Sequence, residues 1–299
     1  MKSQLQQNKK KWNILEVISW TTSYLESNNI ESPRICSEML LAYALNLTRI
    51  DLYLKYDQPL KKTELEFYKS LIKRRIENEP VAYIIGQKGF WTMDFFVSRD
   101  VLIPRPETEI LVETAISLIP SADEKKWNIL DIGTGSGAII LSIASEKEEH
   151  SFFASDISYN ALKIAKKNAA AYGLGDKIFL FCNNLFEAIT NVQYFDMIVS
   201  NPPYISSKTI NSLQPEIKFY EPITALDGDE DGLSFIRKII NQSELYLKPN
   251  GYLIMEIGYD QKESVIQITN STKYFNSIEF IKDYSGHFRV VKLKKNNYV

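Results

Sequence analysis

The feature that most constrains the fold is a glycine-rich turn between an apolar strand and a helix. The segment DIGTGSG occupies residues 131–137, directly after the apolar residues 127–131 and before a helical pattern at 137–145. Glycines turn tightly and let a ligand approach the backbone, because they carry no Cβ. A ligand is therefore expected above the carboxyl end of this strand, where a doubly wound sheet reverses its strand order.

Apolar segments alternate with helical patterns over the rest of this region. Strands are expected at residues 151–156, 177–181, 195–200 and 252–257, with helices at 158–172 and 233–247. Apolar strands joined by helices form a parallel sheet that is covered on both faces. Two last strands at 277–281 and 288–293 are expected to close the sheet as an antiparallel pair. The expected fold class is α/β, with a doubly wound, mostly parallel, seven-stranded sheet.

The preceding residues predict helices instead. Apolar residues recur at helical spacing in 12–20, 32–44 and 61–77. Residues 89–97 are aromatic and β-prone, and we expect them to pair with 101–103 through a turn at 98–100. A helix of about fifteen residues is expected after Pro104. The predicted domains are a small all-helical substrate-recognition domain at 1–88, a β-hairpin linker at 89–103 and the sheet domain at 104–299.

Charge and composition exclude several classes of protein. Residues 1–88 carry 14 Lys and Arg against 10 Asp and Glu, but the whole chain has a net charge of −2. Overall electrostatics therefore cannot hold nucleic acid, and the lysines at positions 2 and 9–11 are expected to form a solvated tail. The two cysteines and two histidines lie too far apart in sequence to predict a metal site. Without a visible signal peptide or an apolar run of about 18 residues, we expect a cytoplasmic protein with no membrane contact.

The glycine turn alone does not identify the ligand. Its Gly133-x-Gly135-x-x-Ala138 spacing also satisfies the looser dinucleotide pattern, so NAD and S-adenosylmethionine both stay open. Asp156 ends the next strand, where a carboxylate can accept both hydroxyls of the ribose that either molecule contains. It can instead cap the following helix, although Ser158 can do this too. Residues 184–186 can pack against an adenine ring or belong to the core.

The segment Asn201-Pro202-Pro203-Tyr204 follows the strand expected at 195–200. In a doubly wound sheet that strand neighbours the first one, so the tetrapeptide faces the glycine turn. Prolines stiffen this loop and donate no N–H. The Asn201 side-chain oxygen and the Pro202 carbonyl can each accept one hydrogen of an NH2 group, and Tyr204 offers a flat face. This grip aims the weak lone pair of a planar nitrogen at an incoming methyl group and stabilises the developing charge.

With these residues in place, the chain resembles a class I S-adenosylmethionine-dependent methyltransferase of the release factor glutamine methyltransferase family. Further matches are LIPRPETE at 102–109, EPITAL at 221–226, DGL at 231–233, EIG at 256–258 with Gln261, and Asp283 with Gly286 and Arg289. The helical N-terminal part and the hairpin fit as well. Asn184 departs from the family pattern that the resemblance implies, because many members have an acidic residue there. Leu185 occupies a position that is aromatic in some members.

The resemblance implies methyl transfer from S-adenosyl-L-methionine to the side-chain amide nitrogen (N5) of the glutamine in the Gly-Gly-Gln motif of peptide chain release factors. Asn201 and Pro202 would hold that amide, with Pro203 and Tyr204 against it. Arg105 and Thr108 would lie near the methionine end of the cofactor. The implied cofactor pocket comprises Gly133, Thr134, Gly135, Ser136, Gly137, Asp156, Leu185 and Asn201. Release factors are the implied partners, without direct DNA contact, and a monomer is expected.

Three alternatives stay open. An amino methyltransferase for adenine N6 or cytosine N4 uses the same grip, although residues 89–299 are acidic and make a poor surface for phosphates. A dehydrogenase is compatible with the glycine turn, but the sequence supplies no convincing hydride-transfer acid. A non-catalytic binding module is disfavoured because both halves of the site are intact in sequence.

Overall fold

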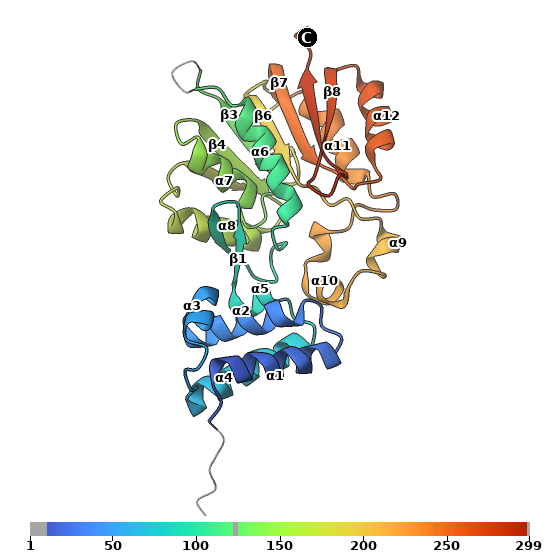
Figure 1. Ribbon diagram of the computed structural model, residues 1–299. Coiled ribbons are helices and arrows are strands. Elements are labelled where there is room, and N and C mark those ends of the chain that lie inside the picture. The colour runs from blue at the N-terminus through green and yellow to red at the C-terminus, as the bar shows by residue number, and fades with distance from the viewer. Residues whose placement is uncertain (1–10, 122–124, 298–299) are drawn as a thin grey trace, which may run out of the picture. The chain divides into compact units, whose positions relative to one another are not determined.

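Two units make up the chain, the first ending at Gly86 and the second beginning at Gln87. The structure is a computed structural model that describes residues 11–121 and 125–297 (Figure 1). Lys2, Lys9 and Lys10 of the expected tail lie outside the described residues. Within the two described ranges, no helix is both long and apolar enough to cross a membrane.

The first unit is helical, as predicted. Its helices are α1 (Ile14–Ser27), α2 (Pro33–Leu45), α3 (Arg49–Leu54), α4 (Lys62–Ile76) and α5 (Val81–Ile85). Asn13 and Glu16 form a capping box at the start of α1, which satisfies backbone N–H groups that a helix end leaves unpaired. The core between these helices is mostly aliphatic and includes the fully buried Leu25, Leu40 and Leu41.

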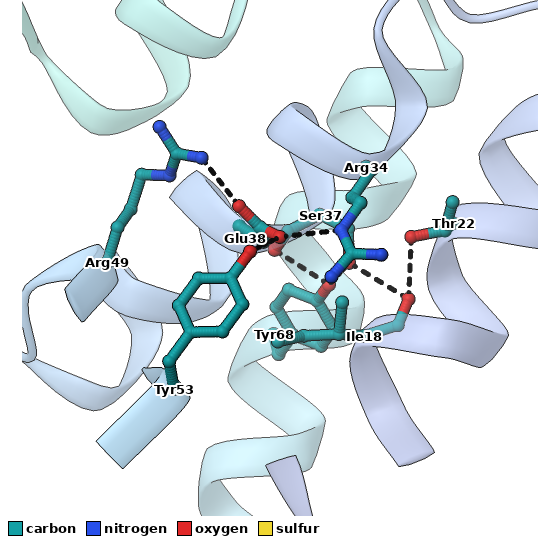
Figure 2. Close-up of polar contacts among 8 residues, drawn as sticks. All are labelled: Ile18, Thr22, Arg34, Ser37, Glu38, Arg49, Tyr53 and Tyr68. Carbon is teal, nitrogen blue, oxygen red and sulfur yellow. Dashed lines mark hydrogen bonds and ion pairs between the residues drawn. The ribbon is translucent and has the colours of Figure 1, made fainter. Parts of the chain in front are cut away.

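A buried carboxylate fastens α3 to α2. Glu38 on α2 accepts hydrogen bonds from Arg34 Nε at 2.9 Å and from Arg49 Nη2 at 2.6 Å, and also from the hydroxyl of Tyr53 (Figure 2). Burial raises the pKa of Glu38, but the hydrogen bonds from these three side chains outweigh it and leave the pKa below its usual value. The short α3 is therefore held by one buried charge as well as by Leu52.

The second unit opens with a hairpin that differs from the predicted one. Its strands are β1 (Gln87–Phe90) and β2 (Met93–Phe96), with Phe90 opposite Met93. The prediction that 89–97 pairs with 101–103 is wrong, because the chain reverses inside the aromatic run at Trp91, whose φ is +55°.

Long-range partners fix this hairpin. Trp91 donates its backbone N–H to Glu109 and its indole N–H to Glu146. Asn168 on α8 (Tyr159–Ala171) bonds both the N–H and the C=O of Phe96. The position of the turn therefore depends on groups that lie far from it in sequence.

Seven strands form one mixed sheet in the order β5-β4-β3-β6-β7-β9-β8. They are β3 (Asn128–Ile132), β4 (Ser151–Asp156), β5 (Ile178–Cys182), β6 (Phe195–Ser200), β7 (Leu247–Glu256), β8 (Phe275–Lys282) and β9 (Phe288–Lys295). The first five are parallel, and β9 is antiparallel to both β7 and β8. The predicted fold class, including the closing antiparallel pair, is confirmed.

Helices cover both faces of this sheet (Figure 1). Ile129 of β3 packs on one face with α6 (Glu109–Leu118) and α7 (Ala138–Glu146), and α6 follows the short 3-10 turn η1 (Pro106–Thr108). Leu130 and Ile132 face the opposite side, with α11 (Ser234–Ser243) and α12 (Lys262–Thr272). Successive side chains of a strand point to opposite faces, so a nearly continuous apolar strand serves two cores.

Between β6 and α11 the chain forms short elements that the sequence pattern does not predict. They are α9 (Ser207–Ile210), α10 (Pro215–Tyr220) and the 3-10 turn η2 (Ile223–Ala225). The helix expected at 233–247 ends at Ser243, and β7 already begins at Leu247. This segment matters for the site, because residues 222–225 form one of its walls.

Candidate active site

The glycine turn is held at the end of β4 by backbone hydrogen bonds. The N–H groups of Gly133 and Thr134 both donate to the Ser155 carbonyl at 2.9 Å. Gly133 and Gly135 have φ of +73° and +55°, and a Cβ built on either meets no atom within 4 Å. Both glycines therefore leave open space where a ligand can approach the backbone.

Asp156, at the end of β4, supports the same turn. One carboxylate oxygen accepts the Gly135 N–H at 2.9 Å and the other accepts the Ser158 N–H at 2.8 Å. Ser158 caps α8 through its own side chain, so the capping role does not depend on Asp156. Burial raises the pKa of Asp156, and the two backbone N–H groups oppose that change. Each carboxylate oxygen keeps acceptor capacity for a ligand hydroxyl.

Asn201 to Tyr204 follow β6, which pairs directly with β3 so that Ser200 lies opposite Ile132. The expected proximity of the tetrapeptide and the glycine turn is thereby confirmed. Gln261 holds this loop: its Nε2 donates to the Tyr204 carbonyl at 3.0 Å and to the Gly232 carbonyl at 3.1 Å. Gly232 has φ of +73°, and a Cβ there would lie 2.5 Å from the Tyr204 carbonyl oxygen.

A cavity of about 380 Å³ brings the two halves together. Among the residues predicted for the site, its lining includes Gly133, Thr134, Gly135, Ser136, Asp156, Leu185, Asn201, Pro202 and Pro203. Arg105 and Thr108 line it as well, whereas Gly137 and Tyr204 do not. A volume of this order is typical of small-ligand pockets, which span about 300–1,000 Å³.

Three of the residues singled out in the sequence lie behind the cavity wall. Gly137 is buried at the start of α7, where a Cβ would come within 2.9 Å of Leu141. Phe186 is fully buried and stacks on Tyr246 with ring centroids 4.5 Å apart, so it belongs to the core. The Tyr204 hydroxyl points to the buried Glu256, to which it donates at 3.0 Å.

Several residues at the site escaped the sequence prediction or were quoted there without a role. Glu256, the last residue of β7, accepts the Thr108 hydroxyl at 2.6 Å, and Asn201 Nδ2 donates to Thr108 Oγ1 at 3.2 Å. Burial raises the pKa of Glu256, whereas the donated hydrogen bonds and the nearby charge of Arg289 oppose that change. The signal for Glu256 in the sequence is an acid at the end of an apolar strand.

A second buried acid, Glu221, pairs with a residue that lines the cavity. Glu221 accepts from Arg105 Nη2 at 2.6 Å and from the Ile103 N–H at 3.4 Å. Burial raises the pKa of Glu221, and the Arg105 guanidinium opposes this. The pair joins the segment before η1 to the loop that contains residues 222–225. Arg105 and Glu221 are 116 positions apart in sequence, and no periodicity relates them.

These groups fit a ribose-containing ligand next to a planar NH2 group. The carboxylate of Asp156 faces the cavity from one side, and the open glycine backbone allows close approach. On the other side are the carboxamide of Asn201 and the stiff backbone of Pro202 and Pro203, a set of acceptors without a backbone donor. The chemistry available is the alignment of a nitrogen nucleophile with an electrophilic carbon.

Comparisons with known proteins agree with this geometry. Residues 16–86 match the family model described as PrmC N-terminal domain, and residues 107–216 match the methyltransferase small domain. The hMettl16 catalytic domain, solved in complex with MAT2A 3'UTR hairpin 6, superposes with a TM-score of 0.56 at 16% identity. The match covers 70% of this chain and 77% of that one, and it shows a shared fold.

Two relatives match nearly from end to end. The release factor glutamine methyltransferase of Geobacter sulfurreducens is 40% identical over 280 residues, covering 94% of this chain and 96% of its own. The protein of the same name from Buchnera aphidicola is 42% identical and covers 88% and 93%. Such identity over both units contradicts the dehydrogenase alternative. The chain belongs to the family of release factor glutamine methyltransferases.

Proposed function

We propose that this chain transfers a methyl group to the side-chain amide nitrogen (N5) of the glutamine in the Gly-Gly-Gln motif of peptide chain release factors, thereby modulating translation termination. The observation that carries the proposal is one cavity that contains the glycine turn, Asp156 and the Asn201–Pro203 backbone. Relatives with 40% and 42% identity that are named for this activity support it.

S-adenosyl-L-methionine is the methyl donor, and when bound it supplies a methyl carbon activated by the neighbouring positive sulfur. Asp156 accepts the hydroxyls of its ribose. The open backbone at Gly133 and Gly135 accommodates the rest of the molecule, together with Thr134 and Ser136. Leu185 adds an apolar wall. Gly137 acts indirectly, by letting α7 begin directly after the turn.

The chain's own residues handle the substrate nitrogen. A carboxamide nitrogen is a poor nucleophile because its lone pair is delocalised. The Asn201 side-chain oxygen and the Pro202 carbonyl accept its two hydrogens in one plane, which directs the remaining electron density out of that plane. Both acceptors also stabilise the positive charge that develops on nitrogen. Holding the nitrogen in this position supplies much of the rate enhancement. Tyr204 supports the loop through its contact with Glu256.

The first unit recognises a surface of the release factor away from the glutamine, because a single side chain offers little specificity. Support comes from exposed apolar residues on α3 and just after it: Ile50 and Leu54 are 72% and 74% exposed, and Tyr56 is 55% exposed. Exposed apolar side chains that gather on one short helix are typical of interaction surfaces. This assigns the helical unit, which ends at Gly86, to recognition and the unit that begins at Gln87, which contains the hairpin and the sheet, to catalysis. The predicted boundaries at 88 and 103 shift accordingly, because β1 already begins at Gln87.

The enzyme acts as a monomer in the cytoplasm, without direct contact with DNA or a membrane. The proposed substrate works in translation, which supports a cytoplasmic enzyme. Sedimentation of the purified protein tests the oligomeric state, since a stable dimer would contradict this part.

The deciding experiment is mass spectrometry of a purified release factor after incubation with the enzyme and S-adenosyl-L-methionine. We expect one added methyl group on the Gly-Gly-Gln glutamine. Asn201→Ala should lower kcat by about 10²- to 10³-fold, as losing one group that stabilises developing charge does elsewhere, while cofactor affinity measured by calorimetry stays mostly intact. Asn270→Ala, an exposed position on α12, is the matched control and should keep full activity.

The same assay offers DNA and RNA beside the release factor. Methyl transfer to adenine N6 or cytosine N4, with none to the release factor, would replace the proposal by the nucleic-acid alternative. Full activity of Asn201→Ala would refute the grip on the amide, whatever the substrate proves to be.

A further inference from the structure

The Asn201 carboxamide is connected to a buried acid through one hydroxyl group. Its Nδ2 donates to Thr108 Oγ1 at 3.2 Å, and Thr108 donates to Glu256 Oε2 at 2.6 Å. Tyr204 donates to the other oxygen of Glu256 at 3.0 Å. Thr108 is 4% exposed and Glu256 is 1% exposed. The chain of contacts therefore begins in the core and ends at the cavity.

When Glu256 is ionised, the hydrogen bonds that connect Glu256, Thr108 and Asn201 can run in only one direction. A carboxylate has no hydrogen to donate, so it accepts from both Thr108 and Tyr204. Thr108 has a single hydroxyl hydrogen, which it gives to Glu256, so toward Asn201 it can accept and not donate. Asn201 must then turn its NH2 group to Thr108. Its oxygen, Oδ1, has no partner among the described residues and is left for a ligand in the cavity.

This matters because the two ends of a carboxamide have nearly the same shape and opposite hydrogen-bonding character. In one orientation Asn201 presents an acceptor to the substrate NH2 group. In the flipped orientation it presents two hydrogens to two hydrogens, which leaves donors unpaired in a confined site and costs binding. Nothing in Asn201 itself distinguishes the two orientations.

We propose that Thr108 and Glu256 are positioning residues that set the polarity of the Asn201 carboxamide, so that its oxygen faces the amide nitrogen to be methylated. The proposal rests on the proposed function and adds two residues to it. Neither residue touches the reacting atoms in this scheme. Both act through Asn201.

Glu256 could matter only because it stabilises the fold. Reversing the direction of every hydrogen bond between positions 256 and 201 separates that role from an effect on the orientation of the Asn201 carboxamide. In Glu256→Gln, the amide can keep its oxygen on Tyr204 and turn its NH2 group to Thr108. Thr108 then donates toward position 201 and favours the flipped Asn201. In Asn201→Asp, two carboxylates compete for the single Thr108 hydrogen. The double variant removes both conflicts, because Thr108 donates to one oxygen of the new carboxylate at position 201 and the other oxygen faces the substrate.

The experiment measures kcat, KM and the cofactor dissociation constant for wild type, both single variants and the double variant, with a purified release factor as substrate. We expect each single variant to lose about 10- to 100-fold in kcat, the loss that corresponds to an unpaired polar group. The double variant should exceed the better single variant by at least about tenfold. The exposed Glu263→Gln on α12 is the matched control.

A double variant no more active than the better single variant, with cofactor affinity intact in all three, would overturn the proposal. If Glu256→Gln does not fold, Thr108→Val and Thr108→Ser decide instead: valine should lower kcat about 10- to 100-fold and serine should retain it, and equal activity of the two would overturn the proposal. A wild-type enzyme that leaves the release factor unmodified would overturn the proposed function and this inference together. If the wild type methylates the release factor but kcat does not recover in the double variant, this inference is overturned and the proposed function stands.

Discussion

Asp131 lies beneath the glycine turn, and its carboxyl group lacks a full set of hydrogen-bond partners. It lies in β3 and is completely buried. One carboxyl oxygen accepts from the Thr134 hydroxyl at 2.6 Å, while the other, Oδ1, has no hydrogen-bond partner among the described residues. Burial, with a smaller contribution from the charge of Asp156, raises the pKa of Asp131 from 3.8 to about 7. Folding therefore takes up a proton between these pH values.

The raised pKa makes stability depend on pH in a definite direction. Well below pH 3.8 both folded and unfolded chains hold the proton, and the folded state keeps its full stability. As the pH rises toward about 7, the unfolded chain is ionised while the folded chain must hold the proton or bury a charge. A pKa difference of this size corresponds to roughly 4 kcal/mol of the free energy of unfolding at about 1.4 kcal/mol per pH unit. A carboxamide at position 131 cannot titrate.

We therefore expect Asp131→Asn to flatten the decline in stability between about pH 4 and pH 7. At about pH 8 the variant should gain roughly 4 kcal/mol relative to wild type, compared with the difference between the two proteins at about pH 4. Urea unfolding followed by circular dichroism at several pH values measures this. The exposed Asp176→Asn is the matched control. Parallel stability curves for wild type and Asp131→Asn would refute the reasoning.

Three further changes test other parts of the molecule. Asp156→Ala should raise the cofactor dissociation constant about 10- to 100-fold in calorimetry, because charge-assisted hydrogen bonds are worth about 1.5–3 kcal/mol. Gly232→Ala should lower kcat more than cofactor affinity, because its Cβ would lie 2.5 Å from the Tyr204 carbonyl oxygen and push the tetrapeptide out of place. Ile50→Asp combined with Leu54→Asp should raise KM for the whole release factor about tenfold or more and leave KM for a short Gly-Gly-Gln peptide unchanged.

Each of these expectations has a result that contradicts it. An unchanged dissociation constant for Asp156→Ala would remove Asp156 from ribose binding. Wild-type kcat for Gly232→Ala would mean that the loop tolerates the displacement. Equal KM changes for the whole protein and the peptide would place the contribution of α3 elsewhere than in docking. Lys55→Asp, an exposed position beside α3, is the matched control for the charge that the α3 variant introduces.

Local patterns in the sequence were enough to predict the class of fold and the proximity of the two halves of the site. Apolar strands alternating with helices predict a parallel sheet, and Asn201 follows the strand that neighbours the glycine turn. Both predictions depend on local signals: periodicity within a few residues, the freedom of glycine and the rigidity of proline. Such signals act within a single element, so they can be read without knowing what that element packs against.

Which side chains contact one another depends on packing between distant parts of the chain. The turn at Trp91 follows from Glu109 and Glu146, and no local signal marks it. Phe186 stacks in the core, although its position after β5 suited an adenine contact equally well. Thr108 and Glu256 meet across 148 residues of sequence. A buried polar group takes whichever partner the packed core brings within reach, so such contacts become definite when the whole sheet and its helices are in place.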